Sequence, residues 1–206
     1  MARTLECNKA RHCLGECEIV TVLRRRLEQQ TDMALRACER VALCSEILGT
    51  IAEGKPMPKP EALPNILQKN DYSCATACLQ CLAKYHYGRS RAVLDLSNPI
   101  RGTDPAALES AIRAGGRWHV KAGASFVSDL SHYAETHRPA ICLITPPGFE
   151  DSHFVVCSGV WRGRIFFHDP LSGPDSMLAS DWEAAWFGLG QYVHYRRWSI
   201  AAWPME

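Results

Sequence analysis

Three prolines in six residues, in the run Lys55-Pro56-Met57-Pro58-Lys59-Pro60, place the strongest constraint on how this chain folds. Each proline fixes its own φ angle and lacks the N–H that a helix or an inner strand requires. A regular element therefore cannot pass through the run. It divides the 206 residues into an N-terminal extension over 1–58 and a main domain over 62–206, and the main domain is long enough to enclose a hydrophobic core.

The N-terminal extension has the pattern of an amphipathic helix. From about residue 16 to residue 52, apolar residues recur at helical spacing with charged side chains between them. Because such a helix is only marginally stable alone, we expect its apolar face to pack on the main domain, a second copy or a partner. Five of the ten cysteines lie in this extension: Cys7, Cys13, Cys17, Cys38 and Cys44. Their spacing matches no common zinc motif, and free thiols, a disulfide and a metal site all stay open.

The main domain begins with helices and continues with strands. Three segments are predicted to be helical: 74–87, 105–114 and 127–135. Later segments rich in β-branched and aromatic residues are predicted to be strands: 140–145, 153–160, 164–168 and a last one from 192 towards 198. A short helix is expected over 182–187. Helices first and consecutive antiparallel strands later is the order of an α+β domain.

Cys74, His153 and Asp169 have the positions that a cysteine hydrolase requires. Cys74 stands where a loop becomes the first helix, and the positive end of the helix dipole favours a thiolate there. His153 begins one predicted strand, and Asp169 ends the next. A turn over 159–163 would pair these strands antiparallel and bring the carboxylate beside the imidazole. The three residues are thus predicted to act as nucleophile, base and orienting group.

The predicted triad lies within a wider set of residues. Three groups have the spacing of a known family: Gln68-x5-Cys74-x3-Cys78-Leu79, His153-Phe154-Val155-Val156 with Gly159, and Asp169-Pro170 with Gly173. In these groups the chain resembles the bacteriocin-processing peptidases, which remove double-glycine leaders from precursor peptides. The resemblance extends from about residue 63 to residue 186. Ser73 and Ala75 depart from it, because the family usually has aspartate and glycine at these positions.

The resemblance implies a fold, an activity and a set of roles. The fold is α+β and papain-like, with N-terminal helices packed on an antiparallel sheet. The activity is that of a cysteine peptidase, which hydrolyses a peptide bond through a Cys74 thioester while His153 protonates the leaving amine. Gln68 would supply a side-chain donor to the oxyanion hole, beside the backbone N–H of Cys74. The implied substrate is the leader of a precursor peptide, cut after two small residues, and no cofactor or metal is implied.

Three alternatives stay open beside this prediction. An inactive domain of the same fold would use its cleft only to bind a peptide, and a papain-like acyltransferase would pass the acyl group to an amine. The spacing Cys74-x3-Cys78-x2-Cys81 also matches the cluster-binding cysteines of radical S-adenosylmethionine enzymes, although those cysteines stand on a loop. His168, the neighbour of Asp169, faces the other side of its strand and is not the predicted base.

Charge and hydropathy limit the partners of the chain. The 23 basic and 22 acidic residues give a net charge of +1, which argues against a nucleic-acid partner. No apolar run approaches the roughly 20 residues of a membrane-spanning helix, and the N-terminus has no secretory pattern. We therefore expect a cytoplasmic enzyme with a peptide or protein substrate. Because no transporter segments follow the main domain, we expect a stand-alone form.

Overall fold

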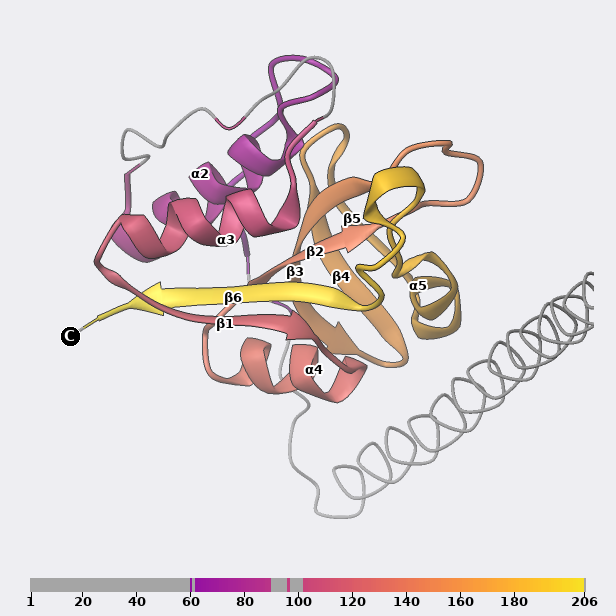
Figure 1. The fold of residues 1–206 in the computed structure, drawn as a ribbon. Helices are drawn as coiled ribbons and strands as arrows, with labels where there is room; N and C mark the ends of the chain where they lie inside the picture. Colours follow the sequence, from indigo (N-terminus) through magenta and orange to yellow (C-terminus); the bar gives the residue numbers. More distant parts are fainter. Residues whose placement is uncertain (1–59, 61, 90–95, 97–101, 206) are drawn as a thin grey trace, which may run out of the picture. The chain divides into compact units, whose positions relative to one another are not determined.

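The computed structural model describes residues 60, 62–89, 96 and 102–205 (Figure 1). The predicted N-terminal helix and its five cysteines lie outside these residues. The described helices are α2 (Cys74–Tyr87), α3 (Pro105–Ala114), α4 (Val127–Glu135), α5 (Ala179–Ala185) and a 3-10 turn at Gly190–Tyr192. The strands are β1 (Trp118–Ala124), β2 (Ala140–Ile144), β3 (His153–Trp161), β4 (Arg164–Asp169), β5 (Gly173–Leu178) and β6 (Trp198–Pro204).

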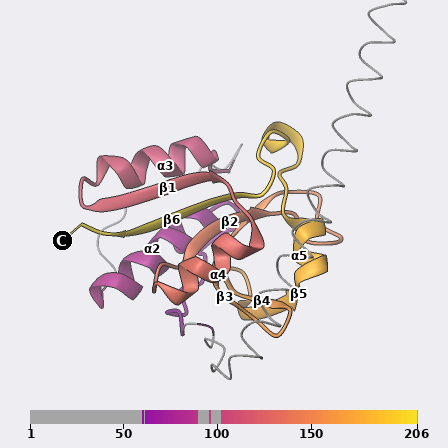
Figure 2. The same ribbon diagram turned by 90° about the horizontal axis from the view of Figure 1, so that it is seen from below.

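The six strands form one sheet in the order β1-β6-β2-β3-β4-β5, and every neighbouring pair is antiparallel. Helices α2 and α3 lie on one face of this sheet, and α4 lies on the other (Figure 1). Seen from below, α3 runs along β1 (Figure 2). The predicted α+β fold, with helices packed on an antiparallel sheet, is confirmed.

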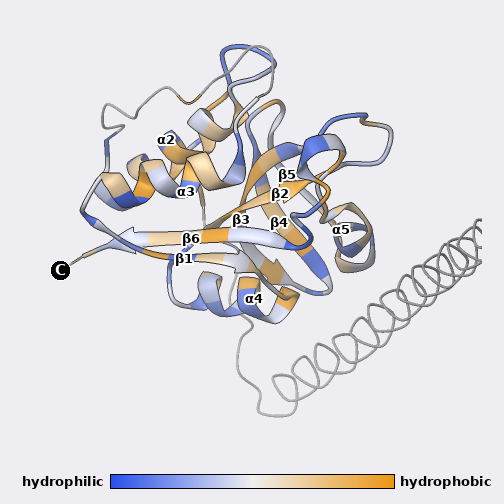
Figure 3. Cartoon of the chain, viewed as in Figure 1, coloured by the Kyte–Doolittle hydropathy of each residue, from blue (hydrophilic) through white to orange (hydrophobic). Residues whose placement is uncertain are grey.

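The main core lies between α2 and the centre of the sheet. Cys78 and Leu82 of the helix pack there with Phe154 and Val156 of β3 and with Ile200 of β6. Hydrophobic residues follow β2 and β3 along their length (Figure 3). Residues 154–160 of β3 are all buried, because helices cover both faces of the strand. This burial makes β3 a rigid support for the residue at its start.

Three parts of the fold differ from the sequence-based prediction. Strands β1 and β5 were not predicted, because β1 has no buried residue and β5 is buried only at Gly173. The short helix α5 begins at Ala179 and ends before Trp186, which already has a non-helical ψ of 65°. Residues 192–197 are not a strand: the 3-10 turn ends there, and Arg197 has a φ of 51°, so β6 begins only at Trp198.

Candidate active site

Ser73 and Cys74 mark the point where the loop after Gln68 becomes α2. Ser73 is the N-cap residue, and its Oγ accepts hydrogen bonds from the backbone N–H groups of Lys69 (3.1 Å) and Asn70 (3.2 Å). Cys74 is the first helical residue, as predicted, and the residue is 9% exposed. Ser73 therefore holds the loop compact directly before Cys74.

Ala75, the second departure from the family pattern, lies away from the site. It is completely buried and packs in the core under α2. Its methyl group therefore does not narrow the space beside the neighbouring thiol.

The start of β3 and the end of β4 bring His153 and Asp169 together. The Nε2 atom of His153 lies 2.7 Å from Oδ1 of Asp169, and both side chains are more than four-fifths buried. The same Oδ1 accepts a hydrogen bond from the backbone N–H of Leu171 at 2.7 Å, which fixes the carboxylate. The predicted antiparallel pairing of these two strands is confirmed, and it places the carboxylate beside the imidazole as expected.

The surroundings of His153 favour its protonated form. Burial by itself lowers the pKa of the imidazole, but hydrogen bonds to Asp169 and Cys74 and the charges of both groups raise this pKa to about 9. Burial also disfavours the charged form of Asp169, yet hydrogen bonds from His153 and from the Leu171 N–H hold its pKa below the ordinary value. Since Nε2 faces Asp169, Nδ1 is the ring nitrogen available to the thiol. The structure thus brings Cys74, His153 and Asp169 into one chain of contacts.

Gln68 lies next to this chain of contacts. Its backbone N–H donates a hydrogen bond to the carbonyl of Pro170 at 2.8 Å, which ties it to the loop after Asp169. Its side-chain Oε1 is buried and has no hydrogen-bond partner among the described residues. The structure therefore ties the backbone of Gln68 to the residue after Asp169, and its role in an oxyanion hole stays a prediction.

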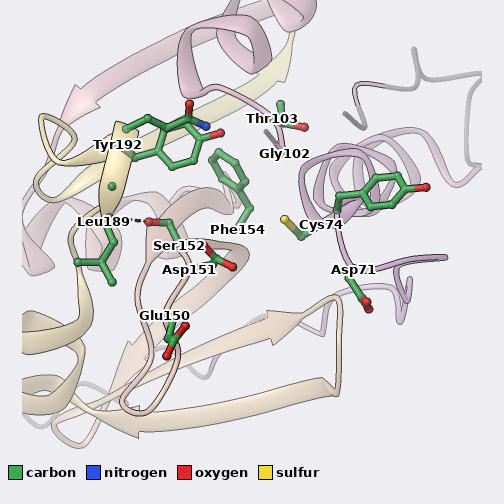
Figure 4. Close-up of a pocket in the computed structure, with 13 residues that line it drawn as sticks. Asp71, Cys74, Gly102, Thr103, Glu150, Asp151, Ser152, Phe154, Leu189 and Tyr192 are labelled. Carbon is green, nitrogen blue, oxygen red and sulfur yellow. Dashed lines mark hydrogen bonds between the residues drawn. The ribbon is translucent and has the colours of Figure 1, made fainter. Parts of the chain in front are cut away.

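A cavity of about 540 Å³ opens beside the Cys74 sulfur (Figure 4). Its walls come from four segments of the chain: Asp71, Tyr72 and Cys74; Gly102 and Thr103; Glu150, Asp151, Ser152 and Phe154; and residues 189–192. Ser152 Oγ accepts a hydrogen bond from the Leu189 N–H at 2.7 Å, which joins two of these walls (Figure 4). His153 lies between Ser152 and Phe154 in the sequence, and both of these residues line the cavity. The wall over 189–192 was not predicted from the sequence, because Tyr192, its one aromatic residue, was assigned to a strand.

The other two cysteines of α2 do not join the site. Burial raises the pKa of the Cys78 thiol and raises that of Cys81 to about 12. Both thiols donate hydrogen bonds into the core, to the carbonyls of Phe154 and Pro64 respectively. Cys74, Cys78 and Cys81 lie on one continuous helix and not on a loop, which contradicts the iron–sulfur hypothesis. In the described part of the chain, no group of three or more His, Cys, Asp or Glu residues is placed to hold a metal ion.

Comparison with known proteins gives a family and a fold. The profile of the peptidase C39 family matches residues 62–194. No curated protein matches the chain. None of the helices in the described ranges is long and apolar enough to cross a membrane.

Solved structures with the same fold include three peptidases. A double-glycine motif protease from an AMS/PCAT transporter, in complex with the leader peptide, is 18% identical, with 71% of this chain and 94% of that one covered and a TM-score of 0.55. The peptidase domain of Streptococcus ComA, a bifunctional ABC transporter, is 19% identical, with coverage of 69% and 98% and a TM-score of 0.52. A C39-like peptidase from Bacillus anthracis is 13% identical, with coverage of 69% and 95% and a TM-score of 0.52.

Proposed function

The chain belongs to the peptidase C39 family, and from this premise we propose that it is a cysteine peptidase that cuts a peptide bond through a Cys74 thioester. The observation that carries the proposal is the chain of contacts from Cys74 to His153 to Asp169, with 2.7 Å between the last two. A thiol, an imidazole with a raised pKa and a fixed carboxylate are the parts that nucleophilic catalysis by cysteine needs.

Each of the four predicted site residues has a defined task in the proposed reaction. The Cys74 thiol gives its proton to His153, and the thiolate attacks the substrate carbonyl so that a C–S bond forms. The oxygen of the tetrahedral intermediate is stabilised by the Gln68 side-chain amide and the Cys74 N–H. The His153 imidazolium then protonates the amine as the C–N bond breaks. A water molecule, deprotonated by the neutral imidazole, hydrolyses the thioester, and Asp169 holds the ring throughout.

We propose the leader of a precursor peptide as the substrate. The solved protease from an AMS/PCAT transporter has this fold and is bound to a leader peptide. In this chain, a Cβ atom added to Gly102 would be in ordinary van der Waals contact with the Tyr192 hydroxyl, at 3.7 Å, so these two lining residues are neighbours in the cavity wall.

A peptide panel tests this function. We expect the protein to cut peptides that carry Gly-Gly before the cut site and to leave matched peptides with Leu-Leu there intact, because the solved protease of this fold that is bound to a leader peptide is a double-glycine motif protease. Mass spectrometry of the products checks this, with the Cys74→Ala protein as the control. If an amine is added to the assay and the cut peptide is found joined to it by an amide bond, the protein is an acyltransferase. Binding without any product would identify an inactive peptide-binding domain.

The raised pKa of His153 predicts the pH dependence of the reaction. The imidazole is protonated below a pH of about 9, so the acid that protonates the leaving amine is present there and is lost as the pH rises through this value. We therefore expect kcat/KM to fall above a pH of about 9. In Asp169→Asn the fall should move to lower pH, because a hydrogen bond and a negative charge that raise the pKa of His153 are weakened or removed. If the fall of kcat/KM at high pH occurs at the same pH in Asp169→Asn as in the wild type, the assignment of His153 as the acid is contradicted.

A further inference from the structure

His168 is a buried polar residue that the reaction described above does not use. It precedes Asp169 on β4, is only 1% exposed, and pairs in register with Val156 of β3. An imidazole in such a place is destabilising unless it is hydrogen-bonded. Its Nε2 atom lies 3.0 Å from the carbonyl oxygen and 3.2 Å from the backbone nitrogen of Ile66. The Nδ1 atom of His168 is buried without a partner among the described residues. The backbone of Ile66 is therefore the hydrogen-bond partner of this imidazole.

The chain around Ile66 depends on contacts of this kind for its position. Residues 62–68, which we name the pre-helix segment, form neither helix nor strand, so no backbone ladder fixes them. Three polar contacts tie the segment to the domain: the Cys81 thiol donates to the Pro64 carbonyl at 3.3 Å, His168 contacts Ile66, and the Gln68 N–H donates to Pro170. The side chains of Leu63 and Ile66 also pack against the core. Two of these polar contacts come from His168 and Pro170, the two residues that flank Asp169.

We propose that His168 is a positioning residue that aligns the oxyanion donor Gln68 with the His153–Asp169 pair. This inference rests on the function proposed above. His168 is adjacent to Asp169 in the chain, and Ile66 is two residues before Gln68, so one side chain joins the strand with the orienting group to the segment with the oxyanion donor. A donor that moves by about 1 Å loses much of its effect on the transition state, whereas binding of the substrate changes little.

Two polar substitutions separate positioning from packing. In His168→Gln the side-chain amide reaches as far as Nε2 and can still bond Ile66, whereas the shorter amide in His168→Asn cannot. We expect the asparagine variant to lower kcat about tenfold with KM unchanged, and the glutamine variant to keep most of the wild-type kcat. Equal kcat values in the two variants, each shown by its melting temperature to be folded, would overturn the proposal.

A double-mutant cycle with Gln68→Ala makes the test independent of general stability. If His168 acts through Gln68, the asparagine substitution lowers kcat in the wild-type background and has no further effect in the Gln68→Ala background. If the double variant instead loses kcat by the product of the two single losses, His168 is merely structural and the proposal is overturned. If the asparagine variant does not fold, the same cycle is measured with His168→Gln. Its smaller loss of kcat should then be absent in the Gln68→Ala background. A loss that persists in that background overturns the proposal. A wild-type protein without any peptidase activity would instead refute the proposed function.

Discussion

Replacing Cys74 with alanine should abolish peptide hydrolysis and leave the fold intact. The thiolate is the only group in the proposed reaction that bonds to the substrate, so its loss removes the covalent pathway. We expect kcat/KM to fall by roughly 10⁴-fold or more, as is usual when a nucleophile is removed. The substitution deletes a single sulfur atom at the wall of the cavity and keeps the Cβ atom of a residue that packs at the edge of the core. An unchanged far-UV circular dichroism spectrum and melting temperature check that the fold is kept.

Cys78→Ala and Cys81→Ala are matched controls, because both residues lie on the same helix as Cys74. Burial raises the pKa of both thiols, so they stay protonated and unreactive at neutral pH. We expect each folded control variant to retain activity. Among the described cysteines, a thiol reagent should label Cys74 alone. Hydrolysis that persists in Cys74→Ala, or that disappears in a folded control, would remove Cys74 from the mechanism.

The helices could be predicted from the sequence because their signals are local. The segment 74–87 has helical periodicity and no glycine or proline before Gly88, which has a left-handed φ of 69° at the C-cap. Asp104 and Pro105 carry their own start signal, and in the structure the Asp104 side chain accepts a hydrogen bond from the Ala106 N–H. Such signals need only a few neighbouring residues.

The edge strands could not be predicted, because their pairing joins distant parts of the chain. In β1, Trp118 pairs with Pro204 and Ala124 with Trp198, so the strand forms only once the C-terminal segment is in place. Proline and glycine at the start of β5 are poor strand formers, and this strand is held by its pairing with β4. Long-range hydrogen bonds here outweigh weak local preferences.

The candidate site likewise has a part that local signals in the sequence predict and a part that depends on long-range contacts. The approach of His153 to Asp169 follows from two consecutive strands, which the sequence indicates. The place of Gln68 came only from the resemblance to a family, because the pre-helix segment has no pattern of its own. The contact between Ile66 and His168 spans 102 positions of the chain, and no local signal could have revealed it. The cavity wall over 189–192 was not predicted for another reason, because Tyr192 was assigned to the start of a strand and lies in a 3-10 turn.

His153→Ala should cause the second large loss of activity, and a larger loss than Asp169→Asn. The alanine variant lacks both the acid that protonates the leaving amine and the base that activates water, so two steps fail together. It also leaves Asp169, which is more than four-fifths buried, without the imidazole at 2.7 Å. We expect kcat/KM to fall by roughly 10⁴-fold or more.

Asp169→Asn should be milder because the ring can keep its place. The Oδ1 atom of an asparagine can still accept from the Nε2–H of His153, so the orientation of the imidazole survives while the stabilisation of its charge is lost. An orienting carboxylate contributes less than the base itself, and we expect a loss at least about tenfold smaller than that of His153→Ala. Steady-state kinetics of both variants, on one peptide and at one pH, decide the order. If Asp169→Asn were the more damaging change, the carboxylate would have to act on the substrate directly, and the roles of the two residues would need to be exchanged.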